Sequence, residues 1–217
     1  MVARARKPVK EAYERLNRLL IARANARYTL HTMPVIVSLL RAVNVGGHAV
    51  IKMADLKSLY ESLKFRDVHT YVQSGNVVFR ADSTDLKLLS KKIQRAIEKR
   101  FRVTPGVLLR TTKDLRNIVA ANPFAKRSDV LPAKLLVYFL QEELSREAPA
   151  QLKKLPPQGE ELIPAKRELY IHFPDGMGKS KLPWRAVEKL CIKPGTGRNW
   201  NTVTKLLAMA EELESSK

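Results

Sequence analysis

Two polar turns, each directly after an apolar run, most constrain what this chain can fold into. Val35–Leu40 is a β-branched and apolar run of strand length, and the polar, glycine-bearing segment Arg41–His48 follows it at once. Further along, Val68–Val72 and Val77–Arg80 flank Gln73–Asn76, which is a hairpin signal because Gly and Asn tolerate positive φ. Short apolar runs bounded by turn residues are typical of buried strands. We therefore expect a sheet with both turns at its strand ends.

Helical spacing between these strands sets the topology. Apolar residues recur at helical spacing over Lys52–Lys64, and again from Leu86 to Phe101 after Asp82-Ser83-Thr84, which offers N-caps. Val107–Arg110 then predicts a further strand. The resulting order is strand–helix–strand–strand–helix–strand, which is the split βαβ or ferredoxin-like arrangement.

The second half of the chain repeats this order less clearly. Thr111-Thr112 caps a short helix that ends near Asn122-Pro123. We then expect a strand over 134–140, a helix over 144–154, a hairpin that joins 160–164 to 168–173, and helices over 183–191 and 200–213 separated by a linker at 193–197. The predicted fold class is α+β: two small ferredoxin-like subdomains with antiparallel sheets, C-terminal helices and a basic N-terminal helical extension. The predicted units are 1–32, 33–122 and 123–217.

The segment 1–32 differs from the rest of the chain in its charge. It carries eight Lys and Arg residues against two Glu residues, and from Pro8 on it has the pattern of a basic amphipathic helix. It lacks the long apolar region and the cleavage site of a secretory signal. Three alternatives stay open: its apolar face docks on the body, it lies on nucleic acid or an anionic membrane surface, or it is poorly ordered.

Composition excludes several classes of protein. The longest apolar runs are strand-length and too short to span a bilayer, so no transmembrane segment is expected. A lone cysteine, Cys191, excludes an internal disulfide framework and suits a reducing cytosol, which makes the cytoplasm the expected location. Four scattered histidines and one cysteine form no zinc-binding spacing. We expect neither a metal nor a cofactor, and the oligomeric state is left open.

The net charge points to an anionic partner. Forty Lys and Arg residues against 21 Asp and Glu residues give a formal charge of +19 and a pI near 10.2. Such a charge attracts polyanions whatever the fold. A basic surface that aids solubility, or that reflects a general bias of the organism, explains the same numbers, and both readings stay open.

The expected topology brings the two opening turns together into one candidate site. The loop after the first strand and the hairpin between the second and third strands open at the same end of a split βαβ sheet, and the first and third strands are neighbours. Amides, a hydroxyl, exposed backbone N–H groups and a cation would then converge on an anionic ligand. The candidate residues are Arg41, Asn44, Gly46, Gly47, Gln73, Ser74 and Asn76. The alternative is structural, with these groups serving only the turns and the hydrogen bonds between the two loops.

Two further segments are secondary candidates for contacts with an anion. Gly176-Met177-Gly178-Lys179-Ser180 has the end of a phosphate-binding loop, but Phe173 occupies the position of its first glycine, so Lys179 and Ser180 are expected at most to contact a phosphate. Arg198, Asn199, Trp200 and Lys205 lie at the start of the last helix, where they could hold a phosphate and stack on a base. The alternative is that Asn199 or Asn201 caps this helix while Trp200 packs into the core. Catalytic residues are unknown, because no spacing motif joins a nucleophile to a base.

Several motifs in series support a resemblance to a known family. Arg41–Gly47, Tyr71–Phe79, Ala121–Phe124, Tyr170–Gly178 and Arg198–Trp200 occur in one order. That order resembles the bacterial family called domain of unknown function 1697, over about Met33 to Leu213, although the family usually has Gly where this chain has Ala42. The resemblance implies a compact α+β fold with ferredoxin-like elements, and it carries no established activity.

Three functions remain open at this point. The first is non-catalytic binding of an anionic ligand, with nucleic acid as the leading partner. The second is an enzyme that acts on a small phosphorylated or carboxylated metabolite in the cleft between the first-strand loop and the hairpin. The third is a mainly structural role or the binding of a protein partner.

Overall fold

The first half of the chain forms one four-stranded antiparallel sheet. The structure is a computed structural model, and it describes residues 15, 18, 33–44, 50–155 and 159–216. The strands are β1 (Val35–Arg41), β2 (Arg66–Tyr71), β3 (Asn76–Arg80) and β4 (Gly106–Thr111), in the order β2-β3-β1-β4. β1 therefore lies between β3 and β4, as the split βαβ order requires. The hairpin turn expected at Gln73–Asn76 joins β2 to β3.

The second half forms another four-stranded antiparallel sheet with the corresponding order. Its strands are β5 (Leu135–Phe139), β6 (Glu161–Pro164), β7 (Glu168–His172) and β8 (Thr196–Asn199), in the order β6-β7-β5-β8. The predicted α+β class with two antiparallel sheets is therefore confirmed. β8 is a difference from the expected fold, because residues 193–197 were predicted to form a linker. Thr196-Gly197-Arg198-Asn199 has no apolar residue, and its pairing with β5 makes it a strand.

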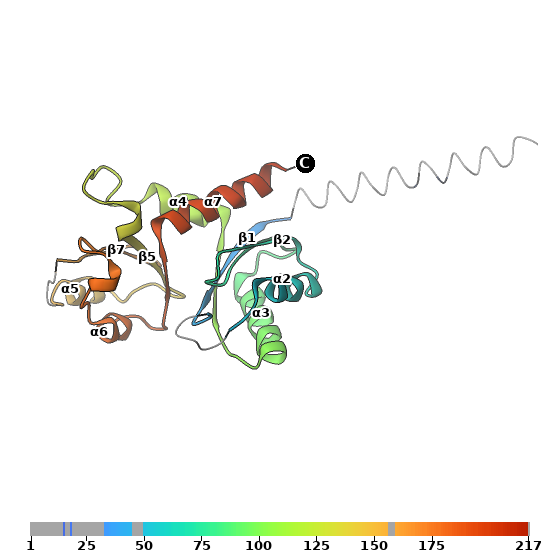
Figure 1. Ribbon diagram of the computed structural model, residues 1–217, viewed down its shortest axis with the longest axis horizontal. Coiled ribbons are helices and arrows are strands. Elements are labelled where there is room, and N and C mark those ends of the chain that lie inside the picture. The colour runs from blue at the N-terminus through green and yellow to red at the C-terminus, as the bar shows by residue number, and fades with distance from the viewer. Residues whose placement is uncertain (1–14, 16–17, 19–32, 45–49, 156–158, 217) are drawn as a thin grey trace, which may run out of the picture.

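Helices α2 (Met53–Ser62) and α3 (Leu86–Phe101) cover the outer face of the first sheet (Figure 1). Leu89, Ile93 and Ile97 of α3 are buried at the helical spacing read from the sequence. The cap of α3 is Asp85, whose side chain accepts from the backbone N–H of Leu88, so the helix begins just after the predicted capping residues. These helices position β1 and its following turn by packing against the back of the sheet.

Shorter helices cover the outer face of the second sheet. They are α5 (Ala148–Leu152) and α6 (Trp184–Lys189), with single 3₁₀ turns at Pro132–Lys134 and Met177–Lys179. The helix predicted over 144–154 is thus only five residues long. Its first turn contains Pro149, which has the φ of a helix start but cannot donate to a preceding turn. Leu152 of α5 and Val187 of α6 are buried against this sheet.

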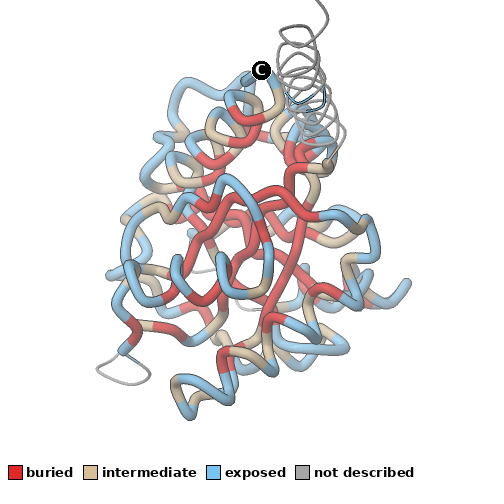
Figure 2. Tube along the Cα trace, turned by 90° about the vertical axis from the view of Figure 1, so that its right-hand side faces the viewer, coloured by how far each residue is buried: buried red, intermediate tan, exposed pale blue. Residues whose placement is uncertain are grey.

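The two sheets share a core between their inner faces. Helices α4 (Thr112–Ala120) and α7 (Trp200–Ser215) run through this layer, where Leu115, Val203 and Leu206 pack with residues of both sheets (Figure 1). Strands β1, β3, β5 and β7 are consequently buried along almost their whole length (Figure 2). Helices on both faces of each sheet explain why these antiparallel strands have continuous apolar sequences instead of alternating ones.

The N-terminal segment and the expected absence of a transmembrane segment are the remaining points of the fold. Of residues 1–32, the structure describes only Arg15 and Arg18, both helical, so the three alternatives for this segment lie outside the described residues. In the part of the chain that is described, no helix has the length and apolar character needed to cross a membrane.

Candidate functional site

The turn after β1 and the hairpin turn between β2 and β3 lie side by side at one end of the first sheet. Leu39 is opposite Asn76 in the β1–β3 pairing, and the Leu40 N–H donates to the Gly75 carbonyl at 2.9 Å. The turns fit so closely that a Cβ at Gly75, which has φ +71°, would lie 2.8 Å from the Cβ of Leu40. Arg41, Asn44, Gln73, Ser74 and Asn76 are thus brought together, whereas Gly46 and Gly47 lie outside the described residues.

The Asn44 side chain ties the first turn to the hairpin. Its amide nitrogen donates to the carbonyls of Ile51 at 2.9 Å and Gln73 at 2.7 Å, and its oxygen accepts from the Ile51 N–H at 2.7 Å. Asn44 has φ 55°, and the nearby Ala42 and Val72 are also left-handed, at 59° and 48°. A β-branched residue rarely adopts this conformation, so the hairpin holds Val72 under strain. The amide of Asn44 therefore serves the shape of the loops.

Arg198 of β8 joins the two halves of the molecule at the same place. Its guanidinium reaches the hairpin and the end of β1, so the motif around Asn76 and the motif around Arg198 meet across 122 positions of sequence. Every N–H of the guanidinium has an acceptor: Asn76 Oδ1 at 2.5 Å, Thr196 Oγ1 at 2.8 Å, and the carbonyls of Gly197 at 2.8 Å, Leu40 at 2.8 Å and Ser74 at 2.9 Å. Arg198 is a buried clamp between the sheets.

All five acceptors of Arg198 are uncharged. A buried arginine is ordinarily paired with a carboxylate, because burial of an isolated charge is costly. Burial lowers the pKa of Arg198 to about 10, which still leaves the side chain charged at neutral pH. The region around Ser74 and Thr196 therefore contains a positive charge that its own hydrogen-bond partners do not cancel.

A pocket of about 260 Å³ opens beside this clamp, between the two sheets. We call it the inter-sheet pocket. Its walls come from β1 and the turn after it, from the hairpin, and from β5, α6 and β8. The lining residues are Leu40, Ala42, Val43, Ser74, Leu136, Tyr138, Met177, Trp184, Thr196, Gly197 and Arg198. The rings of Tyr138 and Trp184 form an aromatic wall, with their centroids 5.6 Å apart.

A polar network borders the inter-sheet pocket. The Tyr138 hydroxyl donates to Glu188 Oε1 at 3.2 Å and accepts from the Gly195 N–H at 3.0 Å. Arg41 donates to the same Glu188 oxygen at 3.3 Å, which also links the first sheet to α6. Burial, and then the negative charge of Glu188, raise the pKa of Tyr138 above its ordinary value. Tyr138 is therefore a neutral hydrogen-bond donor throughout the physiological pH range.

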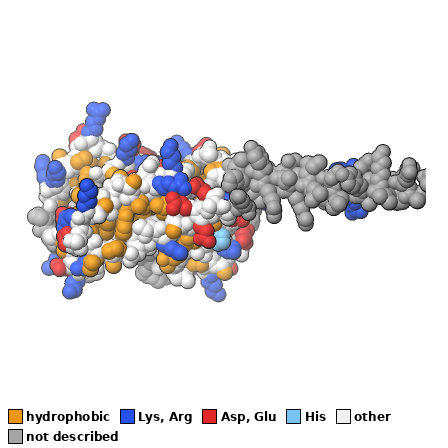
Figure 3. Space-filling model, turned by 90° about the horizontal axis from the view of Figure 1, so that it is seen from above, with side chains coloured by type: hydrophobic (Ala, Val, Ile, Leu, Met, Phe, Trp, Pro, Cys, Tyr) orange, Lys and Arg blue, Asp and Glu red, His pale blue; other side chains and the backbone are white. Residues whose placement is uncertain are grey.

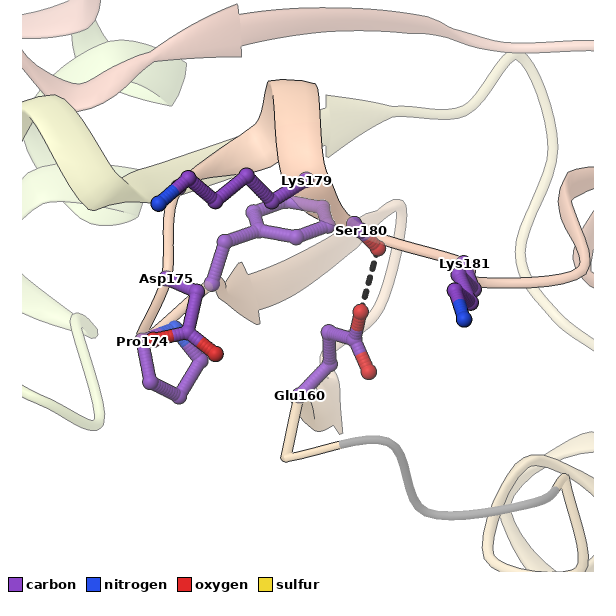
Figure 4. Close-up of a pocket in the computed structure, with 8 residues that line it drawn as sticks. Glu160, Pro174, Asp175, Lys179, Ser180 and Lys181 are labelled. Carbon is purple, nitrogen blue, oxygen red and sulfur yellow. Dashed lines mark hydrogen bonds between the residues drawn. The ribbon is translucent and has the colours of Figure 1, made fainter.

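The secondary candidates are dispersed over the molecule. Lys179 and Ser180 border a separate pocket of about 230 Å³, where Ser180 donates to Glu160 and Lys179 extends away from that pair (Figure 4). Asp175 lines the same pocket, so two carboxylates face any anion there. Lys205 is exposed on α7. Asn199 caps α7 by accepting from the Thr202 N–H, and Trp200 packs against the shared core, as in the structural alternative.

The residues that the second half of the chain contributes to the inter-sheet pocket, apart from Arg198, were not predicted from the sequence. Tyr138 lies within an apolar strand, Trp184 on a short helix, and Thr196 in the segment predicted as a linker. None of them lies in a glycine-bearing turn that follows a strand of the first sheet, and the site was predicted from such turns. The nearest available signal was Arg198, whose motif accompanies the two turns in the sequence.

Comparison with known protein families identifies the family of this chain. A family model described as a protein of unknown function, DUF1697, matches residues 33–170. The chain belongs to this family. The DUF1697 match includes both turns, β5 and most of β7, so it spans strands of both sheets. No curated protein matches the sequence.

A solved structure shares the fold. It is described as the structure of the conserved bacterial protein SP0830 from Streptococcus pneumoniae, and it is similar with a TM-score of 0.65 at 22% sequence identity. The similarity covers 82% of this chain and 99% of the other. At this identity the likeness shows the fold alone. Within the described ranges, His, Cys, Asp and Glu form no group of three or more that could hold a metal ion.

Proposed function

We propose that the protein binds a small anionic ligand in the inter-sheet pocket and does not transform it. The observation that supports this most strongly is the Arg198 guanidinium, which lines the pocket and has only neutral hydrogen-bond partners. A charge in a region of low dielectric acts on a nearby anion far more strongly than a solvated charge does. A negatively charged group in the pocket would therefore gain from Arg198 without displacing any bond of the clamp.

Two hydroxyls add direct donors for the anion. The Ser74 hydroxyl oxygen accepts from Asn76 Nδ2 at 2.9 Å, and the Thr196 oxygen accepts from Arg198 at 2.8 Å. Because each of these oxygens already accepts a hydrogen bond, its own hydrogen is left to donate. Both residues line the pocket. A cation and two hydroxyl donors on one wall match a carboxylate or phosphate group.

The rest of the pocket suits a compact apolar body. Leu40, Val43 and Leu136 add aliphatic surface to the Tyr138–Trp184 wall. A volume of about 260 Å³ is below the usual range for drug-sized ligands, which favours a small molecule with one anionic group and one planar or apolar part. Nucleic acid, the leading partner suggested by net charge, is a polymer that such a pocket cannot enclose.

The lining supports binding more than catalysis. Among the described residues that line the pocket there is no Asp, Glu, His, Lys or Cys, so Ser74 has no neighbouring base to activate it. Tyr138 is held neutral, and Glu188 is engaged by both Tyr138 and Arg41. An enzyme acting on the same small anion would need its general acid or base from elsewhere.

Calorimetric titration with simple probes tests this proposal. Phenyl phosphate and benzoate should bind, inorganic phosphate should bind more weakly, and the neutral analogue benzyl alcohol should not bind. Met177 at the pocket is 54% exposed, so Met177→Trp should block the pocket and abolish binding without disturbing the core. Leu131→Trp is the matched control, because Leu131 is also 54% exposed but lies outside the lining. Equal binding of phenyl phosphate by wild type and Met177→Trp would rule out this pocket.

A further inference from the structure

Another groove, larger than the inter-sheet pocket, lies along β4, the edge strand of the first sheet. It has a volume of about 520 Å³ and runs between α3 and segments of the second half. Leu86, Val107 and Leu109 give it an apolar floor, while Lys87 and Lys91 of α3 face Arg167 and Lys193 across it. We call this feature the α3 groove.

The α3 wall of the groove is strongly basic. Helix α3 holds six Lys and Arg residues and a single Glu. Lys87 and Lys91 are exposed, and in the described chain neither takes part in an ion pair. They are four residues apart, so they lie on one face of the helix, about 6 Å apart along its axis. Arg95 continues the same four-residue step beyond the groove.

The opposite wall carries little net charge, because each of its cations has a carboxylate partner and Glu142 itself lines the groove. Lys193 contacts Glu142 at 2.6 Å, and Arg167 lies 3.9 Å from Asp114, so these two cations are partly neutralised. Glu168 belongs to the buried Arg110 and is not available to the lysines. The uncancelled charge of the groove is therefore that of Lys87 and Lys91, which are exposed to solvent.

Two features of the groove limit what kind of anion it can take. No aromatic residue is among the described lining, so the bases of a nucleic acid would find no ring to stack on. The carbonyls of Val107 and Leu109, on the edge strand β4, already accept from Ser90 Oγ and Arg110 Nη1. A peptide strand added to this edge would find these acceptors occupied. What the groove offers is a pair of exposed lysines beside an apolar floor.

We propose that the α3 groove binds a single strand of nucleic acid through its phosphates, without reading its sequence. Two uncancelled lysines on one helix face, Lys87 and Lys91, suit a chain that carries a charge at every unit, and phosphate contacts alone give sequence-independent affinity. An acidic protein segment is the competing occupant, but its carboxylates would not recur at every unit of the chain. This site is separate from the inter-sheet pocket and does not rest on ligand binding there.

The test is the salt dependence of oligonucleotide binding to the full chain. Fluorescence anisotropy with a labelled oligothymidylate should show a Kd that rises steeply with salt. The variant Lys87→Ala/Lys91→Ala should reduce the slope of log K against log salt by about 1.4, since each phosphate contact on a single strand contributes about 0.7. Random-sequence and oligothymidylate strands should be affected alike, because no base is read.

The control is Lys126→Ala/Lys113→Ala, which removes two exposed lysines outside the groove lining. It should leave the slope unchanged, although it lowers the net charge equally. The same slope in the groove variant and in wild type would overturn the proposal, because the segment 1–32 or general charge would then account for binding. So would displacement of the oligonucleotide by polyglutamate at equal charge concentration, which would identify an acidic protein as the partner. Thermal unfolding of each variant confirms that the fold is retained.

Discussion

Two buried arginines hold the halves of the molecule together, and they do so in different ways. Arg110 on β4 reaches into the second half and bonds the carbonyls of Leu140 and Arg167 at 2.8 and 3.1 Å. Arg198 on β8 reaches in the opposite direction, to the carbonyls of Leu40 and Ser74. Arg110 also forms two bonds with Glu168, at 3.1 and 3.0 Å, whereas Arg198 bonds only neutral groups.

The two arginines differ in whether a buried carboxylate balances their charge. At Arg110 burial lowers the pKa of the guanidinium, and Glu168 opposes that change, so the pair is close to neutral in effect. At Arg198 burial acts with no carboxylate to oppose it. The hydrogen bonds and the charge of Arg110 are both satisfied within the protein. The hydrogen bonds of Arg198 are satisfied, but its charge has no carboxylate partner, and the side chain lines a pocket.

The largest expected effect comes from breaking the paired contact. Arg110→Met leaves Glu168 buried without its cation, and loss of one partner of a buried pair costs about 3–5 kcal/mol of unfolding free energy. Glu168→Leu added to Arg110→Met should restore most of that loss, since the unpaired charge is then removed. Urea unfolding followed by circular dichroism measures both. Failure of the double variant to recover stability would show that the neutral bonds of Arg110, not its ion pair, dominate.

Breaking the unpaired contact should cost less. Arg198→Met leaves several backbone and side-chain acceptors without a donor, but it also removes a buried charge that nothing neutralises, so we expect a loss of about 1–3 kcal/mol. Millimolar phenyl phosphate should raise the thermal midpoint of the wild type and leave that of Arg198→Met unchanged. An equal rise in both would show that the anion does not interact with Arg198.

The smallest expected effect concerns Glu188, the carboxylate at the border of the inter-sheet pocket. Burial, and then the charge of Glu188, raise the pKa of Cys191 to about 11. Because the folded protein holds this proton more tightly than the free thiol does, the contribution of Cys191 to the free energy of unfolding falls as pH rises from about 9 to about 11. Glu188→Gln should lower the pKa of Cys191 slightly and speed its alkylation at pH 8. The rate of iodoacetamide labelling against pH measures the change, and an unaltered profile would place Glu188 too far away to matter.

Much of the fold could be predicted from local pattern, and the site only in part. The strands β1, β3 and β5 have strong apolar runs, and α3 and α7 have clear helical spacing, so their positions follow from the sequence. β8 could not be found in this way, because Thr196–Asn199 is polar and becomes a strand only by pairing with β5. The proximity of Asn44 to Gln73 follows from the order of the first sheet. The pocket does not, because it depends on how a second sheet is placed against the first.

The packing of the two sheets also decides which candidate residues keep a donor or acceptor that could bind a ligand. Asn44, Asn76 and Arg198 have the chemistry of ligand-binding residues, and local pattern alone does not decide between ligand binding and hydrogen bonds to each other or the backbone. Their side chains are used by long-range contacts that only the packed structure defines. Ser74 differs from these three residues, since its hydroxyl oxygen accepts from Asn76 and its hydrogen is left to donate to a ligand.

The position of α7 has a consequence for how the chain is made. The inner face of the first sheet, including Val35, Val37 and Leu39, is covered by Val203, Leu206 and Ala210 of α7, and Arg80 on β3 bonds the carbonyl of Leu213. On the ribosome the first sheet can pair its strands long before α7 has been synthesised. Its inner face then stays open to water, to chaperones and to other nascent chains until the last helix emerges. Premature termination before α7 should therefore yield an aggregating fragment rather than a folded half.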